Sequence, residues 1–247
     1  MIPDNLINLY SMNGDVDIQT SYISHGGENR TYYTYSEELL DSFIAQAHNK
    51  SSFHYYETDQ WLYQALDKYP IMNKNILIIG SEEPCYEGIS IYYGASVTMV
   101  EYQFVTSTHP KLKTLTVEEF KFDPNLYDGA ISISSVEHSG LGRYGDELDP
   151  DGDLKAMEIL YNKLNKGSLC FLAVPVGKDQ ILWNAHRVYG RKRLPLLIKG
   201  FELIDSFGLI DEDLDVDEHN RRQQGRIAHR EGVSVGAHQP ILVLKKQ

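Results

Sequence analysis

The sequence predicts a Rossmann-like α/β domain built on a doubly wound, mostly parallel sheet. Continuous apolar runs, such as residues 75–79, are typical of strands buried on both faces of a parallel sheet. Segments whose apolar residues repeat at helical spacing follow these runs, and alternation of strands with helices indicates a doubly wound arrangement. The length of 247 residues and the apolar fraction of 42% fit one large globular domain.

The first part of the chain, residues 1–70, is expected to extend this core. Residues 1–35 are polar, rich in tyrosine and weakly periodic, which predicts an irregular arm. Thr34 and Glu37 have the spacing of a capping box, so the first helix is expected to begin there. A second helix is expected over 58–68. Whether this extension forms a lid or a dimer contact is left open.

The core itself is expected to occupy residues 71–247. Helices are predicted over 84–94 and 152–165, because apolar residues recur there at helical spacing. Residues 211–238 are charged and predict a loop, either mobile or lying over the site. The strands are expected at 75–79, 96–100, 128–134, 167–174, 201–206 and 240–244.

Acidic residues outnumber basic ones, 35 to 23, for a formal net charge of −12. Nucleic acids and anionic membranes both attract basic surfaces, so neither is an expected partner. No apolar stretch approaches the roughly 20 residues that span a bilayer, and the first residues do not resemble a signal peptide. Cys85 and Cys170 are expected to be reduced thiols, and the protein is expected to be cytoplasmic.

Two neighbouring segments predict a nucleoside-binding site. They are the turn after the first predicted strand and the end of the second predicted strand. Gly80 and Ser81 open that turn, and Glu101 ends the next strand about 20 residues later, where a carboxylate suits ribose hydroxyls. The glycine spacing of dinucleotide-binding proteins is absent, and Glu82 favours a ligand without phosphates. We expect these residues and Tyr102 to bind a cofactor. Taken alone, each has an ordinary alternative, a strand-to-helix turn and a solvated glutamate, but the two signals together reinforce one another.

The segment after the third predicted strand carries the densest set of polar side chains. His138 is the expected general base, and Glu137 is expected to orient it or to hold the cofactor. Ser134 and Ser135 are expected to contact the cofactor. A structural histidine remains the alternative for His138. The same segment offers Arg143, Tyr144 and Asp146 as candidates for binding substrate.

Polar and aromatic residues also follow the fourth predicted strand. His186 is the rival candidate for the base. Asn184, Arg187 and Tyr189 suit a polyhydroxyl substrate, and Arg187 could hold a phosphate of a nucleotide-linked substrate. A surface loop with an arginine-rich edge is the alternative.

No metal site is predicted. Asp149, Asp151 and Asp153 resemble part of a calcium loop, but the glycine is misplaced and Leu160 stands where a glutamate is required. Capping of the helix over 152–165 by Asp151 or Asp153 explains the cluster better.

Four segments of the chain resemble a family of unknown function that was first described from nematode proteins and also occurs in bacteria. The family is regarded as a divergent branch of the class I S-adenosylmethionine-dependent methyltransferase fold. The resemblance covers about residues 70–220 and implies S-adenosylmethionine as cofactor. It implies that Gly80 and Ser81 form the first cofactor motif, that Glu101 binds ribose, and that 134–138 lie beside the transferred methyl. The segments are GSEEPCYEGISIYYGA, VTMVEY, SSVEHSGLGRYGDELDPDGD and LAVPVGKD..LWNAHRVYGRKRLP.

The chain departs from the family at Cys85, where an aromatic residue is expected after Pro84. Members of the family accompany glycan-building enzymes, so the resemblance implies O-methylation of a sugar hydroxyl on a nucleotide-linked or polysaccharide sugar. Two alternatives stay open: a non-catalytic domain that binds a ligand or partner, and a nucleotide-sugar oxidoreductase or epimerase. The missing glycine pattern and the lack of a suitable Tyr-x-x-x-Lys pair disfavour the oxidoreductase. A homodimer is also left open.

Overall fold

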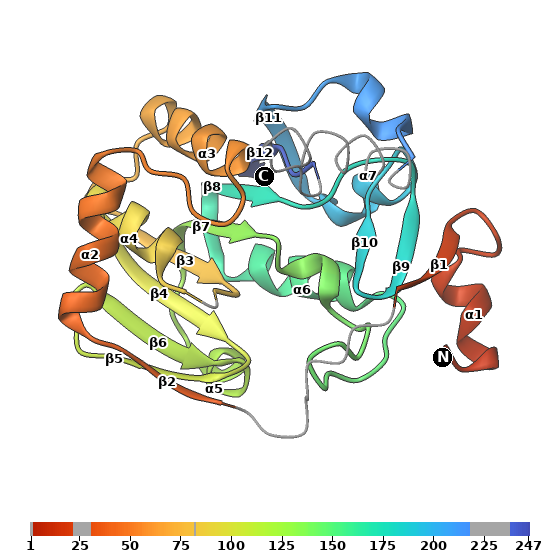
Figure 1. The fold of residues 1–247 in the computed structure, drawn as a ribbon, viewed down its shortest axis with the longest axis horizontal. Coiled ribbons are helices and arrows are strands. Elements are labelled where there is room, and N and C mark those ends of the chain that lie inside the picture. Colours follow the sequence, from red (N-terminus) through yellow and green to blue (C-terminus); the bar gives the residue numbers. More distant parts are fainter. Residues whose placement is uncertain (1, 22–30, 82, 218–237) are drawn as a thin grey trace, which may run out of the picture.

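The computed structural model describes residues 2–21, 31–81, 83–217 and 238–247, and a seven-stranded sheet forms its centre (Figure 1). Across the sheet the strands follow the order β6-β4-β3-β7-β8-β12-β11. All neighbours are parallel except β12, which runs antiparallel to both β8 and β11. The strands are β3 (Asn75–Ile79), β4 (Ser96–Glu101), β6 (Leu112–Thr116), β7 (Tyr127–Ile133), β8 (Leu164–Ala173), β11 (Phe201–Phe207) and β12 (Ile241–Lys246).

The predicted doubly wound, mostly parallel sheet is therefore confirmed. Numbered by their order along the chain, the seven strands lie as 3-2-1-4-5-7-6 across the sheet. The order reverses between β3 and β7, and ligands of such sheets bind at the carboxyl ends of the strands beside this reversal.

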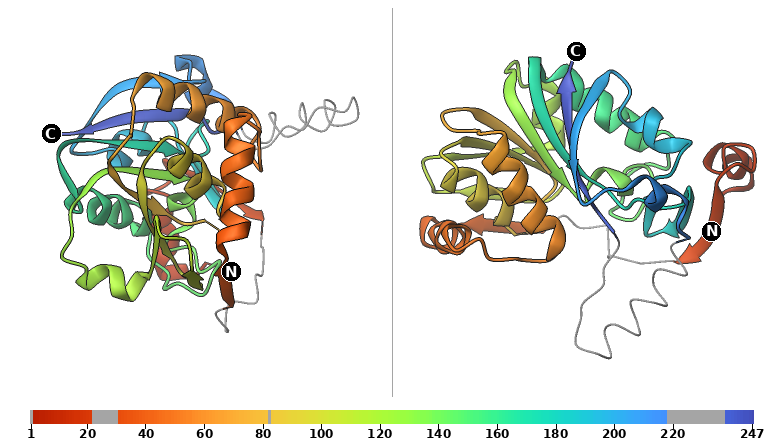
Figure 2. Two further views of the ribbon diagram at one scale, coloured as in Figure 1. Left: turned by 90° about the vertical axis from the view of Figure 1, so that its left-hand side faces the viewer. Right: turned by 90° about the horizontal axis from the view of Figure 1, so that it is seen from above.

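Helices cover both faces of this sheet (Figure 2). Ile76 and Ile78 of β3 pack into one apolar cluster and Leu77 into another, because successive side chains of a strand point to opposite faces. The first face carries α2 (Glu37–His48), α3 (Glu57–Lys68) and α4 (Cys85–Tyr92). The other carries α5 (Val117–Phe122), α6 (Gly152–Asn162) and α7 (Arg193–Leu197).

The described residues of the first 35, which are 2–21 and 31–35, are more regular than the sequence predicts. They contain α1 (Asp4–Tyr10), β1 (Asp17–Ser21) and β2 (Tyr32–Tyr35). The two strands are short and polar, so their stability comes from pairing with distant parts of the chain. β1 pairs parallel with β9 (Gln180–Asn184), which also pairs antiparallel with β10 (His186–Val188). β2 pairs parallel with β5 (Phe104–Ser107).

Two predicted helix caps are wrong. Helix α2 begins at Glu37, and its cap is Ser36, whose Oγ accepts the backbone N–H of Leu39 at 3.1 Å, whereas Thr34 lies in β2. Asp151 is at the cap position of α6 but makes no capping hydrogen bond, and Asp153 is buried against Arg193 instead. The predicted helix over 58–68 is confirmed as α3.

Of the predicted loop over 211–238, the structure describes residues 211–217 and 238, and a 3₁₀ turn spans Asp211–Asp215. The rest of that loop lies outside the described residues. Within the described part of the chain, every helix is too short or too polar to cross a membrane.

Candidate active site

A cleft of about 1760 Å³ opens at the carboxyl ends of β3, β4 and β7, beside the reversal in strand order. The cleft is lined by both parts of the chain, the core and the extension. Most of the predicted site residues line it: Gly80, Ser81, Glu101, Tyr102, Ser134, Ser135, Glu137, His138, Arg143, Tyr144, Asp146 and His186. Glu82, predicted to bind the cofactor, lies outside the described residues.

The wall at β3 and β4 is organised by the carboxylate of Glu101. Its Oε2 accepts the backbone N–H of Ser81 at 2.9 Å, which ties the turn after β3 to the end of β4. Its Oε1 accepts the backbone N–H groups of Tyr102 at 2.8 Å and Gln103 at 3.3 Å. The side chain of Glu101 is half-buried and lines the cleft. The carboxylate is therefore held in one orientation at the position that the sequence predicts.

Gly80 is required by the close approach of two turns. Its φ is +71°, and a Cβ at this position would lie 2.2 Å from Oγ of Ser135. The turn after β3 thus packs directly against the turn after β7. This contact explains the glycine without reference to any ligand.

Beneath this turn, Ser81 meets a second carboxylate. Oγ of Ser81 donates to the carbonyl of Glu83 at 2.7 Å and lies 3.0 Å from Oε2 of Glu87. Burial raises the pKa of the fully buried Glu87 to about 8. Glu87 could not be identified from the sequence, because its position in the first turn of α4 is also typical of an exposed helical glutamate.

His138 and Glu137 lie together on the opposite wall. Nδ1 of His138 is 2.6 Å from the carbonyl oxygen of Ala185, so Nδ1 carries the proton and Nε2 is the basic nitrogen of the neutral ring. Nε2 lies 3.6 Å from Oε1 of Glu137, which also accepts a hydrogen bond from Oγ of Ser134 at 2.8 Å. Only 13% of the His138 side chain is exposed, and it lines the cleft.

Glu137 is completely buried. Burial raises the pKa of this carboxyl group to about 7, although Ser134 and two arginines oppose the shift. Its Oε2 has no hydrogen-bond partner among the described residues. A buried oxygen without a partner is costly, and protonation of the carboxyl or a donor on a bound ligand would relieve this cost. The rings of His138 and His186 lie 6.3 Å apart, so both predicted bases share one region.

One of the predicted substrate-binding residues, Asp146, holds the backbone of the segment after β7. Asp146 accepts the backbone N–H of Gly140 at 2.6 Å and those of Gly142 and Tyr144 at 3.3 Å each. Arg143 donates to the carbonyl of Ala185 at 3.0 Å, and its guanidinium lies 5.0 Å from the centre of the Tyr144 ring. The three predicted residues on this segment thus share one surface of the cleft, but Asp146 holds the loop as well as facing the cavity.

The structure does not bring Asn184, Arg187 and Tyr189 to the cleft, and their predicted contact with substrate has no support from this geometry. All three side chains are buried. Tyr189 donates to Asp153 at 2.9 Å. Arg187 donates to backbone carbonyls of the segment after β7, at 2.6 Å for Ser139. Its further acceptors are the carbonyls of Glu137, Asp149 and Pro150.

Residues of the extension complete the cleft, and sequence reasoning missed them. The hydroxyl of Tyr35 donates to the carbonyl of Ser81 at 3.1 Å, and His54 also lines the cavity. Tyr10 does not line the cleft, but it supports a lining residue, because it donates to the carbonyl of Gly140 and packs edge-on against Trp183. The density of tyrosines in 1–35 was the available signal, because buried tyrosines bring both apolar area and a donor.

These features define the class of the fold. A crystal structure of a 1,6-didemethyltoxoflavin-N1-methyltransferase from Burkholderia thailandensis, with bound substrate and S-adenosylhomocysteine, matches with a TM-score of 0.52 at 14% identity. The match covers 85% of this chain and 87% of that one. The fold is therefore the Rossmann-like fold of the class I methyltransferases, as predicted.

Two further crystal structures are similar. The N-methyltransferase NodS from Bradyrhizobium japonicum has 11% identity over 83% of this chain and 97% of its own, with a TM-score of 0.49. An S-adenosylmethionine-dependent methyltransferase from Archaeoglobus fulgidus has 16% identity over 83% and 99%, with a TM-score of 0.47. No curated protein sequence matches the chain.

The particular family is shown by sequence. Residues 73–247 match the family described as Caenorhabditis protein of unknown function, DUF268, and the chain belongs to this family. The predicted family resemblance is confirmed.

Proposed function

We propose that the chain is an S-adenosylmethionine-dependent methyltransferase and that its acceptor is a sugar hydroxyl, on a nucleotide-linked or polysaccharide sugar. The observation that carries the cofactor assignment is the placement of Glu101. Its carboxylate ends β4 beside the strand-order reversal, lines the cleft and is held by three backbone N–H groups. A carboxylate at this place in a doubly wound sheet suits the two hydroxyls of a ribose.

The cleft also suits the charge and size of this cofactor. Its volume of about 1760 Å³ is large enough for a cofactor and an acceptor together. Carboxyl groups of Glu83, Glu101 and Glu137 line it, which favours a ligand with a sulfonium and an ammonium. When bound, S-adenosylmethionine would supply an electrophilic methyl group.

His138 is the proposed general base for the acceptor hydroxyl. The hydrogen bond from Nδ1 to Ala185 keeps Nε2 unprotonated in the neutral ring, so Nε2 can take the hydroxyl proton. Glu137 would stabilise the imidazolium that forms, because Oε1 is 3.6 Å from Nε2. General base catalysis of this kind contributes about 10²–10⁴-fold.

The choice of a sugar rests on the other groups along this wall. Arg143, Tyr144 and Asp146 present donors, an aromatic ring and acceptors on one side of the cleft, a combination that suits several hydroxyl groups. The family and fold leave the acceptor open. Screening acceptors is therefore the second experiment, after binding of the cofactor.

The first experiment is calorimetric titration of the full chain with S-adenosylhomocysteine, with NAD and nucleotide sugars alongside. We expect micromolar binding, weakened about 100-fold or more in Glu101→Gln, because a ribose bonded to this carboxylate loses charged acceptors. Glu158→Gln, at an exposed glutamate on α6 that does not line the cleft, is the matched control and should bind as the wild type does. Absence of binding, or binding of NAD in its place, would reject the cofactor assignment.

The second experiment is methyl transfer to a panel of nucleotide sugars. His138→Ala should lower kcat about 10²–10⁴-fold with little change in the Kd of S-adenosylhomocysteine. His186→Ala separates the two candidate bases. If both variants turn over as the wild type does, the base assignment is wrong, and cofactor binding without transfer to any acceptor favours a non-catalytic domain.

A further inference from the structure

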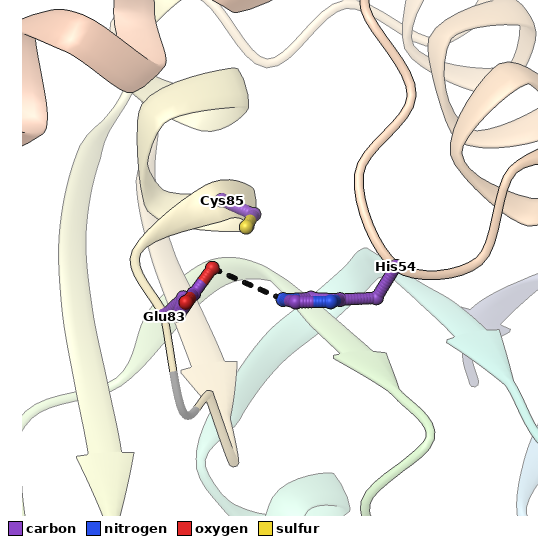
Figure 3. Close-up of side chains that lie close together, drawn as sticks. All are labelled: His54, Glu83 and Cys85. Carbon is purple, nitrogen blue, oxygen red and sulfur yellow. Dashed lines mark hydrogen bonds and ion pairs between the residues drawn. The ribbon is translucent and has the colours of Figure 1, made fainter.

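Three side chains with the donor atoms of a zinc site meet at the rim of the cleft (Figure 3). They are His54, from the loop between α2 and α3, Glu83, from the turn after β3, and Cys85, the first residue of α4. One ligand atom from each lies within 4.8 Å of the other two. Figure 3 shows the sulfur of Cys85 directed toward the pair formed by His54 and Glu83.

We propose that His54, Glu83 and Cys85 bind one zinc ion, which joins the extension to the start of α4. The inference concerns metal binding alone and does not depend on methyl transfer.

The distances fit a tetrahedral ion after a small adjustment. Zinc lies about 2.0–2.3 Å from nitrogen, oxygen and sulfur ligands, so two ligand atoms of a tetrahedral site are about 3.3–3.8 Å apart. Nε2 of His54 and Oε2 of Glu83 are 3.1 Å apart already. The widest spacing in the group is 4.8 Å at most, so a shift of about 1 Å by exposed side chains completes the geometry.

The donor set selects the metal. A thiolate and an imidazole are ligands for zinc, whereas calcium and magnesium require oxygen ligands. Three protein ligands leave one tetrahedral position for water. Since His54 and Glu83 both line the cleft, that position can be reached from the cavity.

The loop that carries His54 and the helix that carries Cys85 are held together by a buried carboxylate. Oδ2 of Asp59 accepts the backbone N–H groups of Phe53 at 2.7 Å and Tyr55 at 3.3 Å, on either side of His54. Oδ1 of the same residue accepts the hydroxyl of Tyr86 at 3.1 Å. Asp59 is fully buried, so the ligands His54 and Cys85 are brought together without the metal.

A simple ion pair explains less of this arrangement. His54 and Glu83 are more than half exposed, and an exposed pair of this kind contributes little to stability. It gives no reason for a thiol to face the pair, whereas a zinc site uses all three groups. On binding, the Cys85 thiol loses its proton to solvent and the thiolate bonds to the metal, so binding releases a proton.

The test is titration of the chelator-treated full chain with Co²⁺, followed by displacement with Zn²⁺, in the absence of nucleosides. We expect one equivalent of Co²⁺, a sulfur-to-cobalt charge-transfer band in the near ultraviolet, and release of about one proton per ion. Cys85→Ser should abolish the band, and His54→Ala should weaken Zn²⁺ binding by at least about 100-fold, because loss of outer-shell partners alone costs 10–100-fold.

The matched controls are Cys170→Ser, at the other buried cysteine, and His48→Ala, at an exposed histidine on α2. Both should bind cobalt with the wild-type spectrum. Absence of the band in the wild type, or a band that survives Cys85→Ser, overturns the proposal. If the wild type shows the cobalt band but does not bind S-adenosylhomocysteine, the proposed function is rejected and the zinc site stands. If it binds S-adenosylhomocysteine but shows no band, the zinc site is rejected and the proposed function stands.

Discussion

On the β3 and β4 side of the cleft one carboxylate, Glu101, holds the backbone, whereas the segment after β7 is held in two ways. Asp146 accepts its backbone N–H groups, and distant side chains donate to its carbonyl oxygens. Glu101 fixes the turn at Ser81 by accepting backbone N–H groups. Arg187 and Tyr10 fix the segment after β7 by donating to its carbonyls. The groups of the first wall are themselves ligand acceptors and face the cavity. On the second wall Asp146 also faces the cavity, but Arg187 and Tyr10 do not line it. A ligand can therefore form bonds to Glu101 or Asp146, and it leaves Arg187 and Tyr10 untouched.

The largest test of this contrast is Arg187→Met. Loss of the buried guanidinium leaves the carbonyls of Glu137 and Ser139 without this donor and removes one of the two guanidinium groups beside Asp153. We expect the free energy of unfolding to fall by about 3–5 kcal/mol. Urea unfolding measures the change. The control is Arg191→Met. The guanidinium of Arg191 pairs with Asp211 and Asp215 on the surface, so its loss should lower the free energy of unfolding far less. Equal losses for the two variants would show that the wall does not depend on Arg187.

The second test uses the pH dependence of stability at Glu137. Because its pKa is raised from 4.5 to about 7 in the folded state, the folded protein holds the proton more tightly, and stability falls as pH rises from about 4.5 to 7. The loss should reach on the order of 2–3 kcal/mol. Glu137→Gln should reduce the slope by this amount and leave the part that the raised pKa of Glu87 contributes. Stability at pH 4.5 should be nearly unchanged, since the amide resembles the protonated carboxyl. A wild-type slope retained in the variant would assign it to another group.

The smallest test is Tyr10→Phe. The variant keeps the edge-on ring contact with Trp183 and loses only the hydrogen bond to Gly140. We expect stability to fall by about 1 kcal/mol, measured by urea unfolding. Tyr32→Phe, at a residue that is 78% exposed, should leave the unfolding midpoint unchanged. An unchanged midpoint in Tyr10→Phe would mean that α1 does not support the segment after β7.

The strands of the large sheet could be predicted because buried strands appear in the sequence as continuous apolar runs, as in 75–79. Glu101 could be predicted because spacing along two adjacent strands fixes its place. Strand β1 could not be predicted, since it has a polar face and depends on pairing with β9, more than 150 residues away. The fold brings β1 and β9 together, and no local sequence pattern indicates this pairing.

The interpretation of arginines and aspartates failed for a related reason. Arg187 suggested phosphate binding, but its acceptors are backbone carbonyls about 40–50 residues distant, which carry no side-chain signature. Asp153 suggested a helix cap and is instead the buried partner of Arg193 and Tyr189. The proposed zinc ligands were missed in the same way, because His54 and Cys85 come from opposite sides of the expected boundary at residue 70.

The parallel pairing of β1 with β9 bears on how this chain could be recombined with its relatives. Asp17 to Ser21 form one edge of a three-stranded sheet, and the opposite edge, β10, contributes Arg187. The first 70 residues are therefore not an interchangeable module. A chimera that joins the extension of one relative to the core of another would have to match this strand register and the Tyr10 contact before the segment after β7 could take its shape.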